Sequence, residues 1–425
     1  MEFDDVHLQD CIRKFDAMSP RPQSLQRILE VSTTAQGMAD VNAFLRDEFC
    51  IRCAERICML EDRLPAQYKR IPELRSVYEK HVRGFVEMRN VNPLDDKFVH
   101  VVRDIVERGR DMVSLLVQGI DRLLHHPETV TTTTTPTATT TTTTDTTTKH
   151  EAVLMDEAST NKFMNEFLLN RIGSNILLSQ YWAVVTGDDP PHPTSIVDPH
   201  CDVTAICRRV AQDVRYLCYN ETKYRPTIRV QAYYESNDME SFAFIPAALS
   251  YIVQELLKNS AIATAHKHQK KKKQQQQRQL RPSKTNNALD DDDTTISVVI
   301  CADPKRVLIH IGDHAGGIPF EVGQHIWSYL YTTKQEQQSD EEDDEGNTLE
   351  DDTPTDGATE LGGYGVGLPL SRLYASYLGG NIHLVSLPGY GTHAYIVLPR
   401  LPEEMVETVP VRATGWQAHR AEFVL

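Results

Sequence analysis

The sequence predicts an α+β fold, in which an N-terminal four-helix-type bundle precedes an α/β sandwich with a mixed sheet. Through residues 20–190, apolar residues recur at three- and four-residue spacing and strand patterns are absent. From about residue 195, β-branched or alternating runs are interspersed with helical stretches. The 425 residues suffice for two domains that each have their own core.

The first domain is expected to span residues 1–190. Its five amphipathic runs are joined by proline-containing segments, and four or five long helices of this kind form a bundle. Residues 127–150 consist mostly of threonine and have almost no apolar side chains to bury, so they are expected to be a disordered insertion. The helical runs are Leu25–Val31, Val41–Ile57, Ile71–Met88, Phe98–Leu124 and Asn161–Val185.

The second domain is expected to span residues 191–405, with a C-terminal tail at 406–425. Strand patterns occur at Thr227–Tyr233, Ile296–Cys301, Arg306–Ile311, Asn381–Leu387 and His393–Leu398. Helical patterns occur at Ala205–Tyr219, Pro246–Lys267, Glu321–Leu330 and Leu368–Leu378. A hairpin at Ile296–Ile311 among strands that alternate with helices indicates a mixed sheet covered on one face.

Two low-complexity segments interrupt this second domain. Residues 267–295 carry the lysine run Lys270–Lys273 next to a glutamine run, and residues 335–360 carry an acidic run. Both segments are interpreted as solvated insertions, because neither has the apolar side chains that a core requires.

Composition excludes several classes of function. The net charge is −16, but ten acidic residues lie between Asp340 and Asp356, and the remainder is too mildly acidic to indicate a nucleic-acid partner. No run of 18 apolar residues is present, so no transmembrane segment is expected. Neither an Arg-rich amphipathic stretch nor an apolar region occurs in Met1–Asp10, so no targeting presequence is visible in this chain.

The eight cysteines show no disulfide-framework spacing, which favours a reducing compartment. Cys50 and Cys53 form a Cys-x-x-Cys pair, but they lie within a helical pattern and no second Cys/His pair stands at ligand spacing. They are therefore interpreted as core cysteines.

Three segments combine into a constellation that carries chemistry. On the predicted helix that begins at Pro246, Glu255 and Asn259 are four residues apart and share one face. A carboxylate there can accept a proton, and a carboxamide oxygen can bind Mg²⁺. A solvated Glu/Asn pair is the alternative when this segment is taken alone.

The other two segments contain glycines after a strand or before a helix. Asp313 ends a predicted strand and is followed by Gly316-Gly317, so a fixed carboxylate could accept the exocyclic amine of adenine beside a flexible turn. Gly362-Gly-Tyr-Gly-Val-Gly-Leu368 runs into an apolar helix, whose backbone N–H groups suit phosphates. It fits neither the Rossmann fingerprint nor the P-loop.

In this order the three segments resemble the N, G1 and G2 boxes of the GHKL ATPase superfamily, which has a Bergerat-type nucleotide pocket. The chain is most similar to one branch, the mitochondrial 2-oxoacid dehydrogenase kinases that act on pyruvate or branched-chain ketoacid dehydrogenase. Further segments whose sequence is similar to that of this family are Ser19–Ser24, Asn170–Ser174, Asp198–Val203, Tyr331–Thr333, Gly367–Tyr374 and Gly389–Thr392.

The resemblance implies a role for each matching residue. Glu255 would be the general base, with Lys258 beside it, and Asn259 would bind Mg²⁺. Asp313 would recognise adenine next to Gly317. Thr392 would either place its hydroxyl near the base or serve only in packing. The remaining ATP-binding residues implied are Ile262, Thr332, Thr333, Gly362, Gly363, Tyr364, Gly365, Val366, Gly367 and Leu368.

The resemblance also implies partners and a location. The cofactors would be ATP and Mg²⁺, the substrate the E1 alpha subunit of a 2-oxoacid dehydrogenase complex, and the docking partner its lipoyl-bearing E2 core. A homodimer in the mitochondrial matrix is implied as well. The sequence of Leu249–Glu255 favours the branched-chain complex, whereas the sequence of Ser371–Tyr374 favours the pyruvate complex. The choice between the two therefore stays open.

Two departures from the family pattern leave a second hypothesis open. Ile262 stands where the family usually has Arg, and Glu107–Met112 lacks the His that the family tends to carry there. The alternative is therefore an ATP-binding scaffold on such a complex that transfers little or no phosphate.

Two other GHKL classes fit the sequence less well. A sensor histidine kinase needs a phosphoacceptor His on the preceding helix, and Asn165–Val185 contains none. A chaperone or mismatch-repair ATPase needs a transducer domain after the pocket, whereas this chain continues for only about 25 residues beyond the last predicted strand.

Overall fold

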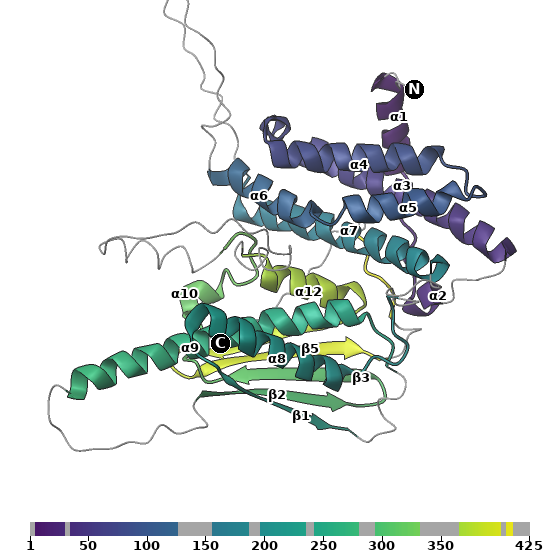
Figure 1. Cartoon of the computed structure of the whole chain (residues 1–425). Coiled ribbons are helices and arrows are strands. Elements are labelled where there is room, and N and C mark those ends of the chain that lie inside the picture. Colours follow the sequence, from purple (N-terminus) through teal and green to yellow (C-terminus); the bar gives the residue numbers. More distant parts are fainter. Residues whose placement is uncertain are drawn as a thin grey trace, which may run out of the picture.

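The structure is a computed structural model that describes residues 5–29, 35–125, 155–186, 196–234, 242–279, 294–331, 365–400 and 405–410. It has a helical N-terminal part and a second part in which helices cover a five-stranded sheet (Figure 1). The predicted α+β fold class is therefore confirmed. No helix among the described residues is both long and apolar enough to cross a membrane.

The bundle is organised around two long helices, α3 and α7. Both pack apolar residues on several sides, as central helices must. Cys50 and Cys53 lie buried in α3, as predicted for core cysteines. The helices are α1 (Asp5–Asp16), α2 (Leu25–Leu29), α3 (Ala35–Arg63), α4 (Pro72–Asn90), α5 (Lys97–Arg108), α6 (Met112–His125) and α7 (Glu157–Val185), with a 3-10 turn at Ala66–Arg70.

One long helix of the prediction is in fact two. The run Phe98–Leu124 breaks after Arg108, where α5 ends and the chain turns before α6. Gly109 has low helix propensity, and its carbonyl accepts hydrogen bonds from the Met112 N–H at 3.2 Å and from the Arg171 guanidinium of α7. A local turn and a contact with a distant helix therefore coincide at the break.

The sheet has the strand order β1-β2-β3-β5-β4 and is mixed, because β1 and β2 are parallel and the other neighbours antiparallel. The helices α8 (Val203–Thr222), α9 (Pro246–Gln279) and α12 (Gly367–Tyr377) lie on the same face of the sheet (Figure 1). The strands are β1 (Thr227–Tyr233), β2 (Thr295–Ala302), β3 (Arg306–Asp313), β4 (Asn381–Leu387) and β5 (Gly391–Pro399). Every predicted strand and the predicted hairpin β2–β3 are confirmed.

Two predictions in this part were wrong. The helix α9 continues to Gln279, so residues 267–279 and the run Lys270–Lys273 are helical rather than a solvated loop. Lys and Gln are good helix formers and no Gly or Pro interrupts them. Conversely, the predicted helix Glu321–Leu330 shortens to the single turn α10 (Phe320–Gly323), because α7 holds the residues that follow. The low-complexity segments 127–150 and 335–360 lie outside the described residues.

Residues 405–410 do not behave as the predicted tail. The Leu25 N–H donates to the Met405 carbonyl at 2.8 Å, and Ser24 and Val406 form an antiparallel bridge. Thr408 also donates its N–H to the carbonyl of Tyr377 at the end of α12. The segment therefore joins the N-terminal part of the chain to α12, while residues 411–425 lie outside the described part.

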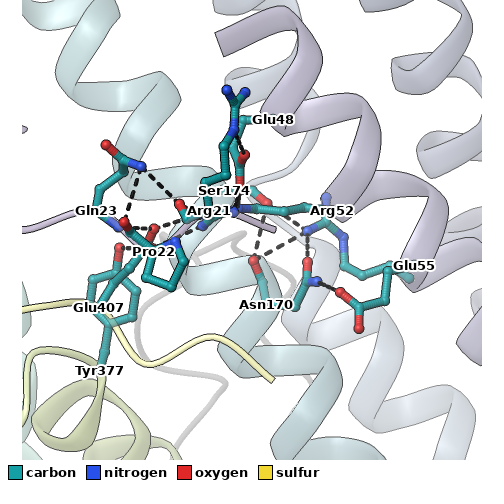
Figure 2. Close-up of polar contacts among 11 residues, drawn as sticks. Arg21, Pro22, Gln23, Glu48, Arg52, Glu55, Asn170, Ser174, Tyr377 and Glu407 are labelled. Atoms are coloured by element: carbon teal, nitrogen blue, oxygen red, sulfur yellow. Dashed lines mark hydrogen bonds and ion pairs between the residues drawn. The ribbon is translucent and has the colours of Figure 1, made fainter. Parts of the chain in front are cut away.

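At this junction Glu407 is buried in a polar network (Figure 2). Its two carboxylate oxygens accept hydrogen bonds from the Arg52 guanidinium, one at 2.9 Å, and Tyr377 donates its hydroxyl at 2.8 Å. Arg52 also contacts Glu48 at 2.8 Å. Burial disfavours the charge of Arg52, but the hydrogen bonds and charge of Glu407 and the charge of Glu48 outweigh it, so the pKa of Arg52 is raised.

Candidate active site

The first wall of the site is α9, which begins at Pro246 and buries an apolar stripe against the sheet. Glu255 is 7% exposed, and its Oε1 accepts from the Lys258 ammonium at 2.9 Å. Asn259, one turn after Glu255, is exposed. The helix thus holds a nearly buried carboxylate, its counter-ion and a solvent-facing carboxamide within two turns.

The second wall is the end of β3, where Asp313 is 3% exposed. Ser260 donates its hydroxyl to Asp313 Oδ2 at 2.7 Å, and the Ala315 N–H donates to Oδ1 at 2.9 Å. Each carboxylate oxygen can accept a further hydrogen bond, so Asp313 is oriented and still able to accept. Sequence reasoning missed Ser260, although a hydroxyl at a buried position of an apolar helix was a visible signal.

The glycine pair after Asp313 permits a close approach of two turns. Gly316 and Gly317 have φ values of 106° and 71°, which side chains rarely adopt. A Cβ on Gly317 would lie 2.2 Å from the Leu387 carbonyl oxygen. The Gly389 N–H donates to the Gly316 carbonyl at 2.7 Å, so the β4–β5 turn lies directly against this loop.

A cavity lies between α9, β3 and β5. Its walls are mostly apolar, with Asp313 among the few polar groups, as in pockets that bind flat heterocyclic ligands. Thr392 pairs with Asp313 across the β3–β5 ladder, and its hydroxyl contacts that of Ser386 at 2.9 Å. Ile262 is half-buried and is not among the lining residues, which are Leu256, Asn259, Ser260, Ala263, Ile311, Asp313, Ala315, Gly317, Ile318, Leu368, Leu384, Thr392 and Ala394.

The third wall is the start of α12. Gly365 has a φ of 67°, and a Cβ there would lie 2.4 Å from the Tyr331 carbonyl oxygen. A Cβ on Gly367, the first residue of α12, would lie 2.2 Å from Glu255 Oε2. No side chain caps the N-terminus of α12 with a hydrogen bond. Thr332, Thr333, Gly362, Gly363 and Tyr364 lie outside the described residues.

The structure therefore brings three distant segments together: the Glu255–Asn259 face, Asp313 with Gly317, and the Gly365–Leu368 start of α12. A buried carboxylate adjoins a helix N-terminus that suits an anion, and an apolar cavity with one oriented carboxylate lies next to them. This arrangement can hold a purine at one end and phosphates at the other, with a base beside the phosphates.

Two family comparisons match this division of the chain. Residues 22–198 match the family described as mitochondrial branched-chain alpha-ketoacid dehydrogenase kinase, and residues 245–402 match the histidine kinase-, DNA gyrase B- and HSP90-like ATPase family. The first match covers α2 to α7, and the second covers α9 to β5 with the whole site.

Relatives match the chain along nearly its whole length. A pyruvate dehydrogenase (acetyl-transferring) kinase isozyme 4 of Ictidomys tridecemlineatus is 27% identical, covering 94% of this chain and 86% of the relative. The Homo sapiens isozyme 4 is 26% identical over the same shares, and an Arabidopsis thaliana kinase is 24% identical over 94% of both. The chain belongs to the mitochondrial 2-oxoacid dehydrogenase kinase family, within the GHKL superfamily.

The helical part in Figure 1 corresponds to the kinase family match, and the part with the sheet corresponds to the ATPase match. The cavity between α9 and the sheet lies within the ATPase match, and so does the start of α12. The resemblance expected from the sequence is thereby confirmed at the level of the family.

Proposed function

We propose that this protein is an ATP-dependent serine kinase that phosphorylates and inactivates the E1 component of a 2-oxoacid dehydrogenase complex. Family membership supports the class of reaction. The observation that carries the proposal is the contact between Gly367 and Glu255: a base lies directly against the helix N-terminus that suits phosphate.

Each residue then has a physical task. Glu255 accepts the proton of the substrate serine, and Lys258 holds its carboxylate in place. Asp313 accepts a hydrogen bond from the adenine amine in the apolar cavity, and Thr392 lines the same cavity from β5. Backbone N–H groups within residues 362–368 bind the phosphates.

Mg²⁺ fits this site as a companion of the nucleotide. Asn259 presents an exposed carboxamide at the rim of the cavity, and Mg²⁺ prefers one or two protein oxygens with phosphates and water completing its shell. Among the described residues no group of three His, Cys, Asp or Glu could hold a metal ion by itself. Mg²⁺ would neutralise phosphate charge, and Asn259 would hold it there.

The substrate would be the E1 alpha subunit, with the lipoyl-bearing E2 core as docking partner, a homodimer as the assembly and the mitochondrial matrix as the location. The named relatives are mitochondrial kinases that act on pyruvate dehydrogenase, whereas the helical part matches a branched-chain kinase family. Both E1 proteins are therefore substrates to test.

The deciding experiment measures phosphate incorporation from labelled ATP into E1 alpha of each complex. We expect incorporation with one of the two and none without Mg²⁺. The second candidate function, an ATP-binding scaffold, is favoured by Ile262, which stands half-buried where the family carries an arginine. Binding of ATP and of the complex without any incorporation into either E1 would establish the scaffold instead.

The adenine site gives a first testable prediction. Asp313→Ala removes the acceptor for the adenine amine and leaves that amine unpaired in an apolar cavity. We expect ATP affinity to weaken by about 1–3 kcal/mol in calorimetry. Asp303→Ala, at an exposed turn on the same strand pair, is the matched control, and equal affinities for both variants would contradict the adenine assignment.

The start of α12 gives a second prediction. In Gly367→Ala the new methyl group would lie 2.2 Å from Glu255 Oε2, so the carboxylate must move away. We expect the rate of phosphate transfer to fall by about 10-fold or more, because a displacement of a catalytic group of about 1 Å is costly. Gly84→Ala in α4, whose Cβ would meet Phe49 at an ordinary 3.6 Å and which has no positive φ, is the matched control for an added methyl group. Equal rates in the two variants would contradict the contact.

A further inference from the structure

Three polar residues form a stripe on the first turns of α7. Glu157, Asn161 and Asn165 are spaced by four residues, so they lie on one face of the helix. All three bond to residues 325–329, a segment that follows α10 and is not helical. Side chains of α7 in the helical domain thus bind a segment of the nucleotide-binding domain.

The bonds converge on Tyr329. Asn161 Oδ1 accepts the Tyr329 N–H at 2.9 Å, and Asn165 Oδ1 accepts the Tyr329 hydroxyl at 2.8 Å. Asn161 also donates its Nδ2 to the Ser328 hydroxyl at 3.2 Å, and Ser328 donates to Glu157. Tyr329 is 4% exposed, and burial raises the pKa of its hydroxyl, which stays a donor at any physiological pH.

The backbone next to Tyr329 is strained. Leu330 has a φ of 66°, a left-handed conformation that a residue with a branched side chain seldom adopts. Such a conformation persists only where the surroundings hold it in place. Leu330 packs against the hydrophobic core, and the two asparagines fix the adjacent Tyr329 at its backbone N–H and at its hydroxyl. The asparagines therefore help to hold the strained residue in place.

On its other side the same segment contacts the active site. Gly365 approaches Tyr331 so closely that a Cβ would lie 2.4 Å from its carbonyl oxygen. The ring of Trp327 lies 5.0 Å from the Arg372 guanidinium of α12. Two residues after Gly365, Gly367 lies against Glu255. Residues 325–331 therefore contact α7 on one side and the start of α12 on the other.

We propose that Asn161 and Asn165 are positioning residues of the ATP site, which act through Tyr329 and the strained Leu330 on the placement of Gly365–Gly367 beside Glu255. The proposal rests on the proposed function in taking Mg·ATP as the ligand. It makes the affinity for nucleotide depend on how α7 of the helical domain is placed. Any change that shifts α7 along this face would then alter nucleotide binding without touching the nucleotide.

The test compares Tyr329→Phe, Asn165→Ala and the double variant. Tyr329→Phe keeps the ring and removes only the hydroxyl, and Tyr216→Phe is the matched control, because Tyr216 is 63% exposed on α8. Two readouts are used: the Mg·ATP dissociation constant from calorimetry, and amide hydrogen exchange of residues 365–370 without nucleotide.

We expect each single variant to weaken Mg·ATP binding about 3–10-fold, as the loss of one buried hydrogen bond allows. The double variant should bind Mg·ATP about as tightly as the single variant that binds less well, because both substitutions remove the same hydrogen bond. Exchange at 365–370 should become faster in all three and stay unchanged in Tyr216→Phe. A purely structural role would instead accelerate exchange at 325–331 only and leave the affinity unchanged, and this result would overturn the proposal.

The outcomes separate this proposal from the proposed function. A wild-type protein that binds Mg·ATP but phosphorylates neither E1 refutes the kinase. The affinity comparison then still decides the role of Asn165, and the same comparison with Asn161→Ala decides that of Asn161. A wild-type protein that binds no Mg·ATP also refutes the kinase, and exchange at 365–370 then decides: faster exchange supports the positioning role, and unchanged exchange refutes it.

Discussion

Replacing Glu255 with Gln is expected to lower phosphate transfer by about 10²–10⁴-fold while the affinity for Mg·ATP changes little. Gln keeps the shape of the side chain and a carbonyl oxygen toward Lys258, but it cannot take up a proton. A base acts as the substrate hydroxyl attacks, so its loss raises the barrier without weakening nucleotide binding. The measurement is initial-rate phosphate incorporation into E1 alpha, together with ATP titration.

Two further variants sharpen this comparison. Asn259→Ala should weaken both nucleotide binding and transfer, because Mg²⁺ bridges the phosphates that bind and the charge that develops on them. Glu221→Gln, on the exposed end of α8, should change neither. Full activity in Glu255→Gln would show that another group is the base, even if the protein is a kinase.

Replacing Glu407 with Ala is expected to lower the free energy of unfolding by about 3–5 kcal/mol. The change leaves the Arg52 guanidinium, whose side chain is 0% exposed, without one of its two carboxylate partners. It also removes the acceptor of the Tyr377 hydroxyl and of the Gln23 N–H. Chemical unfolding followed by circular dichroism would measure the loss.

The control for this prediction is Asp104→Ala, which removes an exposed partner of Arg103 and should cost at most about 1 kcal/mol. The double variant Arg52→Met with Glu407→Leu removes this ion pair and leaves Glu48 paired with the Arg21 guanidinium at 3.2 Å. It should be more stable than Glu407→Ala alone, because the buried guanidinium that has lost a partner is no longer present. A Glu407→Ala protein as stable as the wild type would show that residues 405–410 do not join the two parts in solution.

Local patterns anticipated much of this molecule. The five strands were predictable because their β-branched, alternating residues face helices on one side of the sheet only. The Glu255–Asn259 pair was predictable because a four-residue spacing defines one helix face. The glycines before α12 predicted backbone conformations that other residues rarely adopt, and Gly365 has such a conformation, with a positive φ.

Other features could not be read from neighbouring residues. Ser260 is the partner of Asp313 only because α9 lies across the end of β3, 53 residues away in sequence. The helix expected at Glu321–Leu330 fails because Asn161 takes the Tyr329 N–H that a helix would use, across 168 residues. No window of local periodicity contains both partners.

By itself, therefore, the sequence determined the two-part α+β organisation and the strands, since these depend on periodicity along the chain, and its motifs pointed to the family. The chemical roles of the site residues stay predictions. Only the tertiary structure decided where Phe98–Leu124 breaks, that Glu407 is buried, and that Gly367 lies against Glu255. Arg52 and Glu407 are 355 residues apart, and their pairing depends on how the chain folds back on itself. The hydrogen bonds and burial that hold such pairs exist only after distant elements meet, so no local propensity encodes them.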